Sequence, residues 1–104
     1  LSDSAVALQT TVAVAVDSPV EKVQTILLDA LHTVQDVIEE PAAQVHFSRI
    51  SADGLEFTLQ FWVADRLTSR LAVISRVHGA AWAALQSAGI TLPPPKPLSA
   101  AGNF

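Results

Sequence analysis

The sequence has no cysteine, few basic residues and no long hydrophobic run. Without cysteine the chain can form neither disulfide bonds nor thiolate metal sites, so packing alone must stabilise its fold. Its six lysine and arginine residues are scattered and its net charge is −4, which argues against a nucleic-acid-binding surface. No apolar run approaches the ~18 residues of a membrane-spanning helix, and the first residues do not show the basic stretch followed by an apolar one that is typical of a signal peptide. We therefore expect a soluble segment taken from a longer protein.

Apolar residues occupy half of the 104 positions, which is enough for one domain with a single core. The first clear pattern is a period of two from residue 11, which predicts a β-strand with Val12, Val14 and Val16 on one face. The next stretch, "DSPVEK", carries helix-start signals: Ser18 suits the N-cap, Pro19 the first turn and Glu21 a capping box. The helix should end before Pro41. Its expected apolar stripe is Val20, Val23, Leu27, Leu31, Val34 and Ile38.

Two more strands are expected in the middle of the chain. The stretch "QVHFSRI" (residues 44–50) reads as a strand, and "SADG" as a turn, because Asp-Gly readily takes the positive φ of a tight hairpin. The stretch "LEFTLQFWVAD" (residues 55–65) alternates most clearly. Its polar face carries the large aromatic residue Trp62. Its predicted core face consists of Leu55, Phe57, Leu59, Phe61 and Val63.

A second helix is expected from about residue 68 to residue 87, with Gly89 in the left-handed conformation just beyond its end. Its predicted apolar stripe is Leu71, Ile74, His78, Ala81, Leu85 and Ala88. The stretch "ITL" (residues 90–92) then reads as a short fourth strand. The prolines of "PPPKP" cannot donate to a sheet, so the chain should leave as a polyproline-like arm.

This order of elements predicts an α+β fold, a ferredoxin-like βαββαβ sandwich in which two helices cover one face of a four-stranded sheet. Residues 1–10 are expected to be the end of an upstream segment or a linker. Residues 11–93 form the predicted domain, and residues 94–104 a proline-rich C-terminal arm.

The residues that could support chemistry do not form a catalytic or metal-binding motif. His32, His46 and His78 lack the spacing of metal ligands, and no nucleophile motif joins serine, histidine and aspartate. Glu39 and Glu40 diverge at a helix end, which makes them poor acid and base partners. We expect no enzyme activity, no metal and no cofactor.

Four stretches resemble the C-terminal cytoplasmic α/β domain of the small-conductance mechanosensitive channel family, the MscS-like channels. The stretch "VAVAVDSPVEKVQTIL" resembles the family's first strand and capped helix, and "EEPAAQV" its acidic-proline link to the second strand. The stretch "LEFTLQFWV" resembles its long third strand, with Trp62 at the matching position, and "LQSAGITLPPPKPL" its last helix end and strand. Their order and spacing hold over residues 11–98. Pro94 and Lys96 depart from the aromatic residue and the glutamine that the family prefers.

The resemblance implies a homo-oligomer, a heptamer in the full-length channel, whose α/β domains form the vestibule wall beneath a pore that opens under membrane tension in osmotic stress. It implies a place on the cytoplasmic side of the inner membrane, with membrane contact only through segments upstream of Leu1. The isolated fragment is expected to be monomeric or weakly associated. Candidate subunit-interface residues are Trp62, Leu92, Pro93 and Pro95. Exposed aromatic residues are enriched at interfaces, and the alternative is that Trp62 packs under its own chain.

The sequence leaves two interpretations open for each of two groups of charged residues. Asp36, Glu39 and Glu40 can make a portal negative, or they are a solvated helix end. The preferred interpretation of the three arginines Arg66, Arg70 and Arg76 is that they form a solvent-facing surface of the second helix. The alternative is that they donate salt bridges between subunits. Exposed pairs of that kind contribute only ~0–1 kcal/mol each.

Two other functional classes stay open. One is a ferredoxin-like regulatory domain that binds a small ligand, although the first turn, "VDSPVE", lacks the glycines that such a domain would use. The other is an oligomerisation domain of a different protein. A shared fold does not decide between them.

Overall fold

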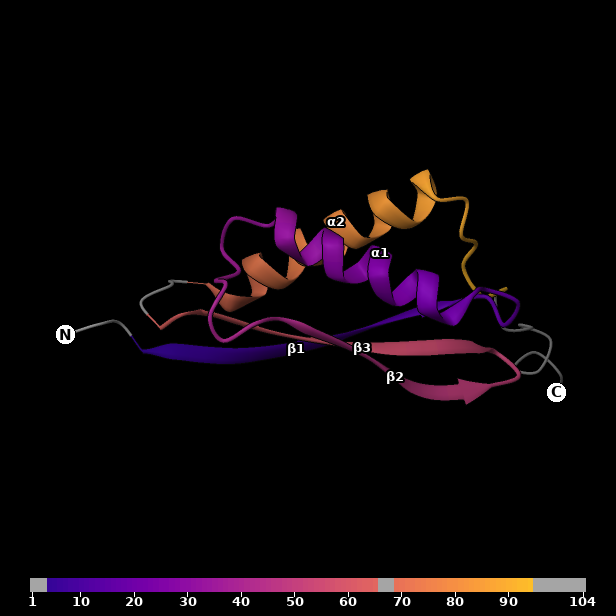
Figure 1. Ribbon diagram of the computed structural model, residues 1–104, viewed down its shortest axis with the longest axis horizontal. Helices are drawn as coiled ribbons and strands as arrows, with labels where there is room; N and C mark the ends of the chain where they lie inside the picture. Colours follow the sequence, from indigo (N-terminus) through magenta and orange to yellow (C-terminus); the bar gives the residue numbers. More distant parts are fainter. Residues whose placement is uncertain (1–3, 66–68, 95–104) are drawn as a thin grey trace, which may run out of the picture.

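The computed structural model describes residues 4–65 and 69–94 of the chain. These residues form, in order, β1 (Ala5–Val14), α1 (Val20–Thr33), β2 (Gln44–Ser51), β3 (Gly54–Ala64) and α2 (Arg70–Ser87). Figure 1 shows two layers, with both helices lying antiparallel across one face of the sheet. The α+β architecture predicted from the sequence is therefore confirmed.

Strand β3 lies at the centre of the sheet, in the order β1-β3-β2, and both of its pairings are antiparallel. One of its faces is apolar along its whole length, and this face belongs to the core. The predicted core face is confirmed: Leu55, Phe57, Leu59, Phe61 and Val63 are all buried. On the opposite face the side chains, including that of Trp62, are half-buried.

The sheet has three strands within the described residues, so the fourth strand expected at residues 90–92 is not formed there. The segment does lie beside the end of β1, where Ala15 N–H donates to the carbonyl oxygen of Thr91 at 2.9 Å. Pro93 and Pro94 follow and have no N–H groups, so they cannot extend a ladder. At this edge, one backbone hydrogen bond is therefore present where a ferredoxin-like sheet would have a fourth strand.

Three predicted boundaries were wrong. Strand β1 starts at Ala5, so residues 5–10, which the sequence assigned to a linker, belong to the sheet. Helix α1 has Pro19 at its N-cap position with no side-chain capping bond, so Ser18 does not cap it. The same helix ends at Thr33, and the last two residues of its predicted stripe, Val34 and Ile38, lie in the connection to β2.

Helix α2 buries only part of the predicted stripe: Ala81 and Leu85 are buried as expected, and the rest of the buried face is rotated toward Val73 and Val77. Its buried residues are Val73, Val77, Ala81 and Leu85, whereas Leu71 is 79% exposed and His78 is exposed. The prediction failed because alanine and valine make two neighbouring stripes of this helix equally apolar. The helix begins after Ser69, whose hydroxyl accepts a hydrogen bond from the backbone N–H of Ala72 at 3.1 Å.

Two glycines are required for different reasons. Gly89 ends α2 with a φ of 75°, as the sequence predicted. Gly54 does not adopt a positive φ, so the expected Asp-Gly turn geometry is not the reason for it. A Cβ atom on Gly54 would lie 2.8 Å from the carbonyl oxygen of Val14 and 3.0 Å from Cγ of Pro93. The absence of a side chain at residue 54 therefore allows the β2–β3 hairpin, the end of β1 and the departing chain to meet.

Candidate functional site

The chain leaves the folded domain at the β2–β3 hairpin. Pro93 is half-buried against Gly54, and Leu92 is 46% exposed beside it. Together with Arg49 and Asp53 of the hairpin, Pro93 and Pro94 line a shallow hollow of about 360 Å³. We name residues 91–94 the arm exit. Pro95, the fourth candidate interface residue, lies outside the described residues.

Trp62 lies at the other end of the sheet from the arm exit. It pairs with Ala7 of β1, and its carbonyl oxygen accepts a hydrogen bond from the N–H of Ile38 at 3.0 Å. Along β3, Trp62 and Gly54 are roughly 26 Å apart at about 3.3 Å per residue. The structure thus places Leu92 and Pro93 together but separates both of them from Trp62. Any interface that includes all three must involve contacts at both ends of the domain.

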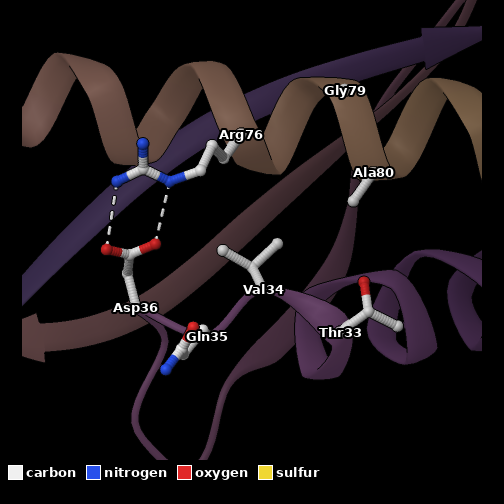
Figure 2. A pocket seen from close by; sticks show the side chains of 7 residues that line it. All are labelled: Thr33, Val34, Gln35, Asp36, Arg76, Gly79 and Ala80. Carbon is white, nitrogen blue, oxygen red and sulfur yellow. Dashed lines mark hydrogen bonds and ion pairs between the residues drawn. The ribbon is translucent and has the colours of Figure 1, made fainter.

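Figure 2 shows an ion pair that joins α2 to the connection between α1 and β2. Arg76 Nε donates to Asp36 Oδ1 at 2.9 Å, and Arg76 Nη2 donates to Asp36 Oδ2 at 3.0 Å. The two parallel bonds make the fork geometry that arginine favours with carboxylates. The hydrogen bonds from Arg76 hold the pKa of the Asp36 carboxyl below its ordinary value, and the carboxylate raises the pKa of Arg76.

A hollow of about 510 Å³ lies beside this ion pair. Its lining residues are Thr33, Val34, Gln35, Asp36, Arg76, Gly79 and Ala80. The two charged groups satisfy one another, and over residues 4–65 and 69–94 no buried side-chain nitrogen or oxygen lacks a partner. The hollow therefore offers shape but no unpaired buried group with which to fix a ligand.

The pairing of Asp36 with Arg76 could not be found from the sequence, because the two residues are forty positions apart. The sequence grouped Asp36 with Glu39 and Glu40 at a helix end. In the structure α1 has already ended at Thr33, and Asp36 turns toward α2 while both glutamates are exposed.

The three histidines lie on separate elements. His32 is exposed in the last turn of α1, and His46 Nε2 lies 3.0 Å from Gln44 Oε1 on β2. On α2, His78 Nε2 lies 2.7 Å from the hydroxyl oxygen of Thr10. Among the described residues no three histidine or carboxylate side chains are grouped as metal ligands.

In the part of the chain that the structure describes, neither α1 nor α2 is long and apolar enough to span a lipid bilayer.

Comparison with known proteins gives one family and one fold. The sequence model of the family described as "Mechanosensitive ion channel MscS, C-terminal" matches residues 8–92. The crystal structure of Helicobacter pylori MscS in the closed state is similar, with a TM-score of 0.80 and 18% identity over 89% of this chain. The cryo-EM structure of Arabidopsis thaliana MSL1 A320V has a TM-score of 0.73 and 15% identity over 88% of this chain. No curated protein sequence matches.

These matches differ in what they establish. The solved structures share too little sequence for more than the fold to be carried over. The present chain covers 36% of the length of each of those two chains, so it corresponds to about a third of such a protein. The family match, in contrast, covers most of the chain and includes Trp62, the arm-exit residues Thr91 and Leu92, and the Asp36–Arg76 ion pair.

Proposed function

The chain belongs to the mechanosensitive ion channel MscS family as a C-terminal domain, and from this premise we propose that it forms part of a vestibule wall beneath a tension-gated pore. The resemblance noted in the sequence is thereby confirmed, and the family is one of ion channels, not of enzymes. The observation that carries the proposal is the family match over residues 8–92, supported by the shared fold.

The proposal places this domain on the cytoplasmic side of the inner membrane, as part of an integral membrane protein. Contact with the membrane would be made by parts of the protein outside the segment described here. Residues 94–104 would act as the C-terminal arm, and the folded domain would extend from β1 to the arm exit. We also propose that residues 90–92 take the place of the fourth strand of a ferredoxin-like sheet. The support for this is the hydrogen bond from Ala15 N–H to the carbonyl oxygen of Thr91.

The position of the candidate interface residues supports a role in a ring of subunits. Trp62 is at one end of β3 and the arm exit, with Leu92 and Pro93, is at the other. A wall built from repeated copies needs contacts on two sides of each subunit, because head-to-tail contacts are what close a ring. We propose a homo-oligomer, a heptamer in the full-length protein, in which these two ends meet neighbouring subunits.

The charge of the wall would come from fewer residues than the sequence implied. Asp36 is neutralised by Arg76, whereas Glu39 and Glu40 are exposed on the same connection. A negative portal would therefore depend on the two glutamates, and charged rings of that kind favour cations.

The subunit count is the direct test of this proposal. The full-length protein that carries this chain would be purified in detergent, and its mass measured by light scattering corrected for bound detergent. Seven copies are expected. A monomeric or dimeric full-length protein would contradict the proposed wall.

A second experiment on the full-length protein tests the candidate interface residues. Leu92→Asp should weaken the oligomer, because it places a charge in an apolar subunit contact. Val16→Asp is the matched control, since Val16 is similarly exposed, at 51% against 46% for Leu92, and is not a candidate interface residue. Equal oligomer stability in both variants would remove Leu92 from the proposed interface.

A further inference from the structure

One aspartate of the chain is directly followed by glycine: Asp53, at the tip of the β2–β3 hairpin. A side chain shields the peptide nitrogen of its own residue, whereas glycine leaves that nitrogen open to the carboxyl group of the residue before it. The Asp53–Gly54 peptide is therefore the place in the sequence where an aspartate side chain can react most easily with the main chain. The residues that follow the other aspartates all carry a side chain: Ser4, Ser18, Ala30, Val37 and Arg66.

The structure leaves the carboxyl group of Asp53 available for this reaction. Asp53 is exposed, and its backbone N–H donates to Ser51 Oγ at 3.2 Å. Over residues 4–65 and 69–94, none of the hydrogen bonds or ion pairs involves the Asp53 carboxylate, whereas the carboxylates of Asp36 and Asp65 are each bonded to an arginine. Asp53 and Gly54 also line the hollow of about 360 Å³ beside the arm exit, so water can reach both.

We propose that Asp53 is a site of spontaneous modification, at which aspartate isomerises to isoaspartate and loosens the arm exit. The nitrogen of Gly54 attacks Cγ of Asp53 and gives up its proton, a Cγ–O bond breaks, and one water molecule leaves as a five-membered succinimide ring forms. Water then opens the ring at one of its two carbonyl carbons. Opening at Cγ restores aspartate, and opening at the main-chain carbonyl carbon gives isoaspartate, in which the chain runs through Cβ and Cγ. One water leaves and one enters, so the reaction needs no further reactant.

The product does not fit the place where three segments meet at Gly54. Isoaspartate adds one carbon atom to the main chain directly before this glycine. A Cβ atom on Gly54 would already lie 2.8 Å from the carbonyl oxygen of Val14 and 3.0 Å from Cγ of Pro93, so the glycine has little room to shift. The lengthened turn should therefore displace Pro93 and weaken the neighbouring backbone hydrogen bond from Ala15 N–H to the carbonyl oxygen of Thr91.

The test of the modification is to age the 104-residue chain in warm neutral buffer for several weeks. Isoaspartate is labelled with an L-isoaspartyl methyltransferase and located by electron-transfer fragmentation of the peptides. It should form at Asp53 about tenfold faster than at Asp17, which is also exposed but precedes a serine. Asp53→Glu is the matched variant: it keeps the charge but would have to form a six-membered ring, so residue 53 should stay unmodified. Equal rates at Asp53 and Asp17, or equal modification of residue 53 in the variant, would overturn the proposal.

The effect on the arm exit is measured on the isoaspartate form after its separation by chromatography. Amide hydrogen exchange at Ala15 should be about tenfold faster than in the unmodified chain, because Thr91 holds this N–H less firmly. The amide of Leu59, in the central strand between Thr10 and Val45, is the control and should exchange equally slowly in both forms.

Repair supplies a second readout of the same effect. Methylation of the isoaspartate by the methyltransferase returns it through the succinimide to aspartate, and Ala15 exchange should then return to its initial rate. Unchanged Ala15 exchange in the isoaspartate form would overturn the proposed loosening. Equal acceleration at Leu59 would also overturn it, because the whole domain would then have opened. None of these results depends on whether the full-length protein is a heptameric channel.

Discussion

Arg76 on α2 and Asp36 in the α1–β2 connection form a two-bond ion pair across forty residues of sequence, with N···O distances of 2.9 and 3.0 Å. The connection contains no helix or strand of its own, so this pair is one of the contacts that hold it against the helical layer. The pair is partly exposed, with side-chain exposures of 54% for Arg76 and 20% for Asp36, so solvent weakens it.

The first prediction concerns Arg76→Gln. Removing the guanidinium should let the pKa of Asp36 rise toward its ordinary value, because the hydrogen bonds from Arg76 are the largest cause of its lowering. The Asp36 carboxyl resonance, followed by NMR across pH, measures this directly. Arg70→Gln is the control, since Arg70 pairs with Asp65 through a single exposed contact at 3.2 Å. An unchanged Asp36 pKa in Arg76→Gln would contradict the assigned pairing.

The ion pair also predicts a pH dependence. Asp36 has a lower pKa folded than unfolded, so its contribution to stability is fully present above the unfolded pKa of about 4 and is lost as pH falls through the folded pKa. The wild type should therefore lose more stability than Arg76→Gln on acidification below about pH 4. Denaturant unfolding at pH 7 and at pH 3 measures the two differences. Parallel losses in both proteins would show that the pair contributes nothing at neutral pH.

The second prediction compares two glycines. Gly54→Ala should lower the free energy of unfolding by about 1–3 kcal/mol, because its Cβ would lie 2.8 Å from the Val14 carbonyl oxygen and force the strands or Pro93 to move. Gly79→Ala should instead raise it by about 0.5–1 kcal/mol, because Gly79 is inside α2 and nothing lies within 4 Å of the added atom. Urea unfolding of both variants measures the signs. Two effects of the same sign would contradict the assigned role of Gly54.

The third prediction concerns the core. Phe61 is fully buried in β3, and Phe61→Ala should cost about 3–5 kcal/mol of unfolding free energy. Phe47 is 38% exposed at the edge of the sheet, where its ring stacks on Phe57 with centroids 5.2 Å apart. Phe47→Ala should therefore cost less than Phe61→Ala, since less apolar area is removed from the core. Equal losses would mean that the β2 edge is as well packed as the centre of the sheet.

The fourth prediction concerns the isolated chain. It should be monomeric or weakly associated at ~100 µM, because sevenfold closure is expected to depend partly on segments outside it. Sedimentation velocity distinguishes the cases, and a stable heptamer of the isolated chain would contradict this prediction.

The sequence predicted best where one pattern had one interpretation. The alternation of β3 is unambiguous because its core face carries five large apolar residues and its other face is mostly polar, so both the strand and its buried face were predicted correctly. The left-handed conformation of Gly89 was also predicted correctly. The glycine directly follows the last residue of a helical stripe, which is the usual position of a left-handed residue that ends a helix.

The sequence predicted less where local patterns were degenerate or contacts were distant. The first half of β1 alternates alanine with Val6 and Leu8, a contrast too weak to be identified as a strand without its partner β3. The buried face of α2 was only partly predicted: Ala81 and Leu85 are buried, but the neighbouring stripe with Val73 and Val77 is equally apolar and is buried in place of Leu71. Neither the Asp36–Arg76 pair nor the contact of Gly54 with Pro93 has a local signal, because each joins segments about forty residues apart.

The central claim is that this chain is a domain of a channel that opens under membrane tension. The most direct measurement is patch-clamp recording of the full-length protein in lipid vesicles under graded suction, with empty vesicles as the control. The account predicts a conductance that is closed at rest and opens reproducibly as suction increases. Vesicles with verified protein incorporation that show no conductance at any tension below rupture would contradict it.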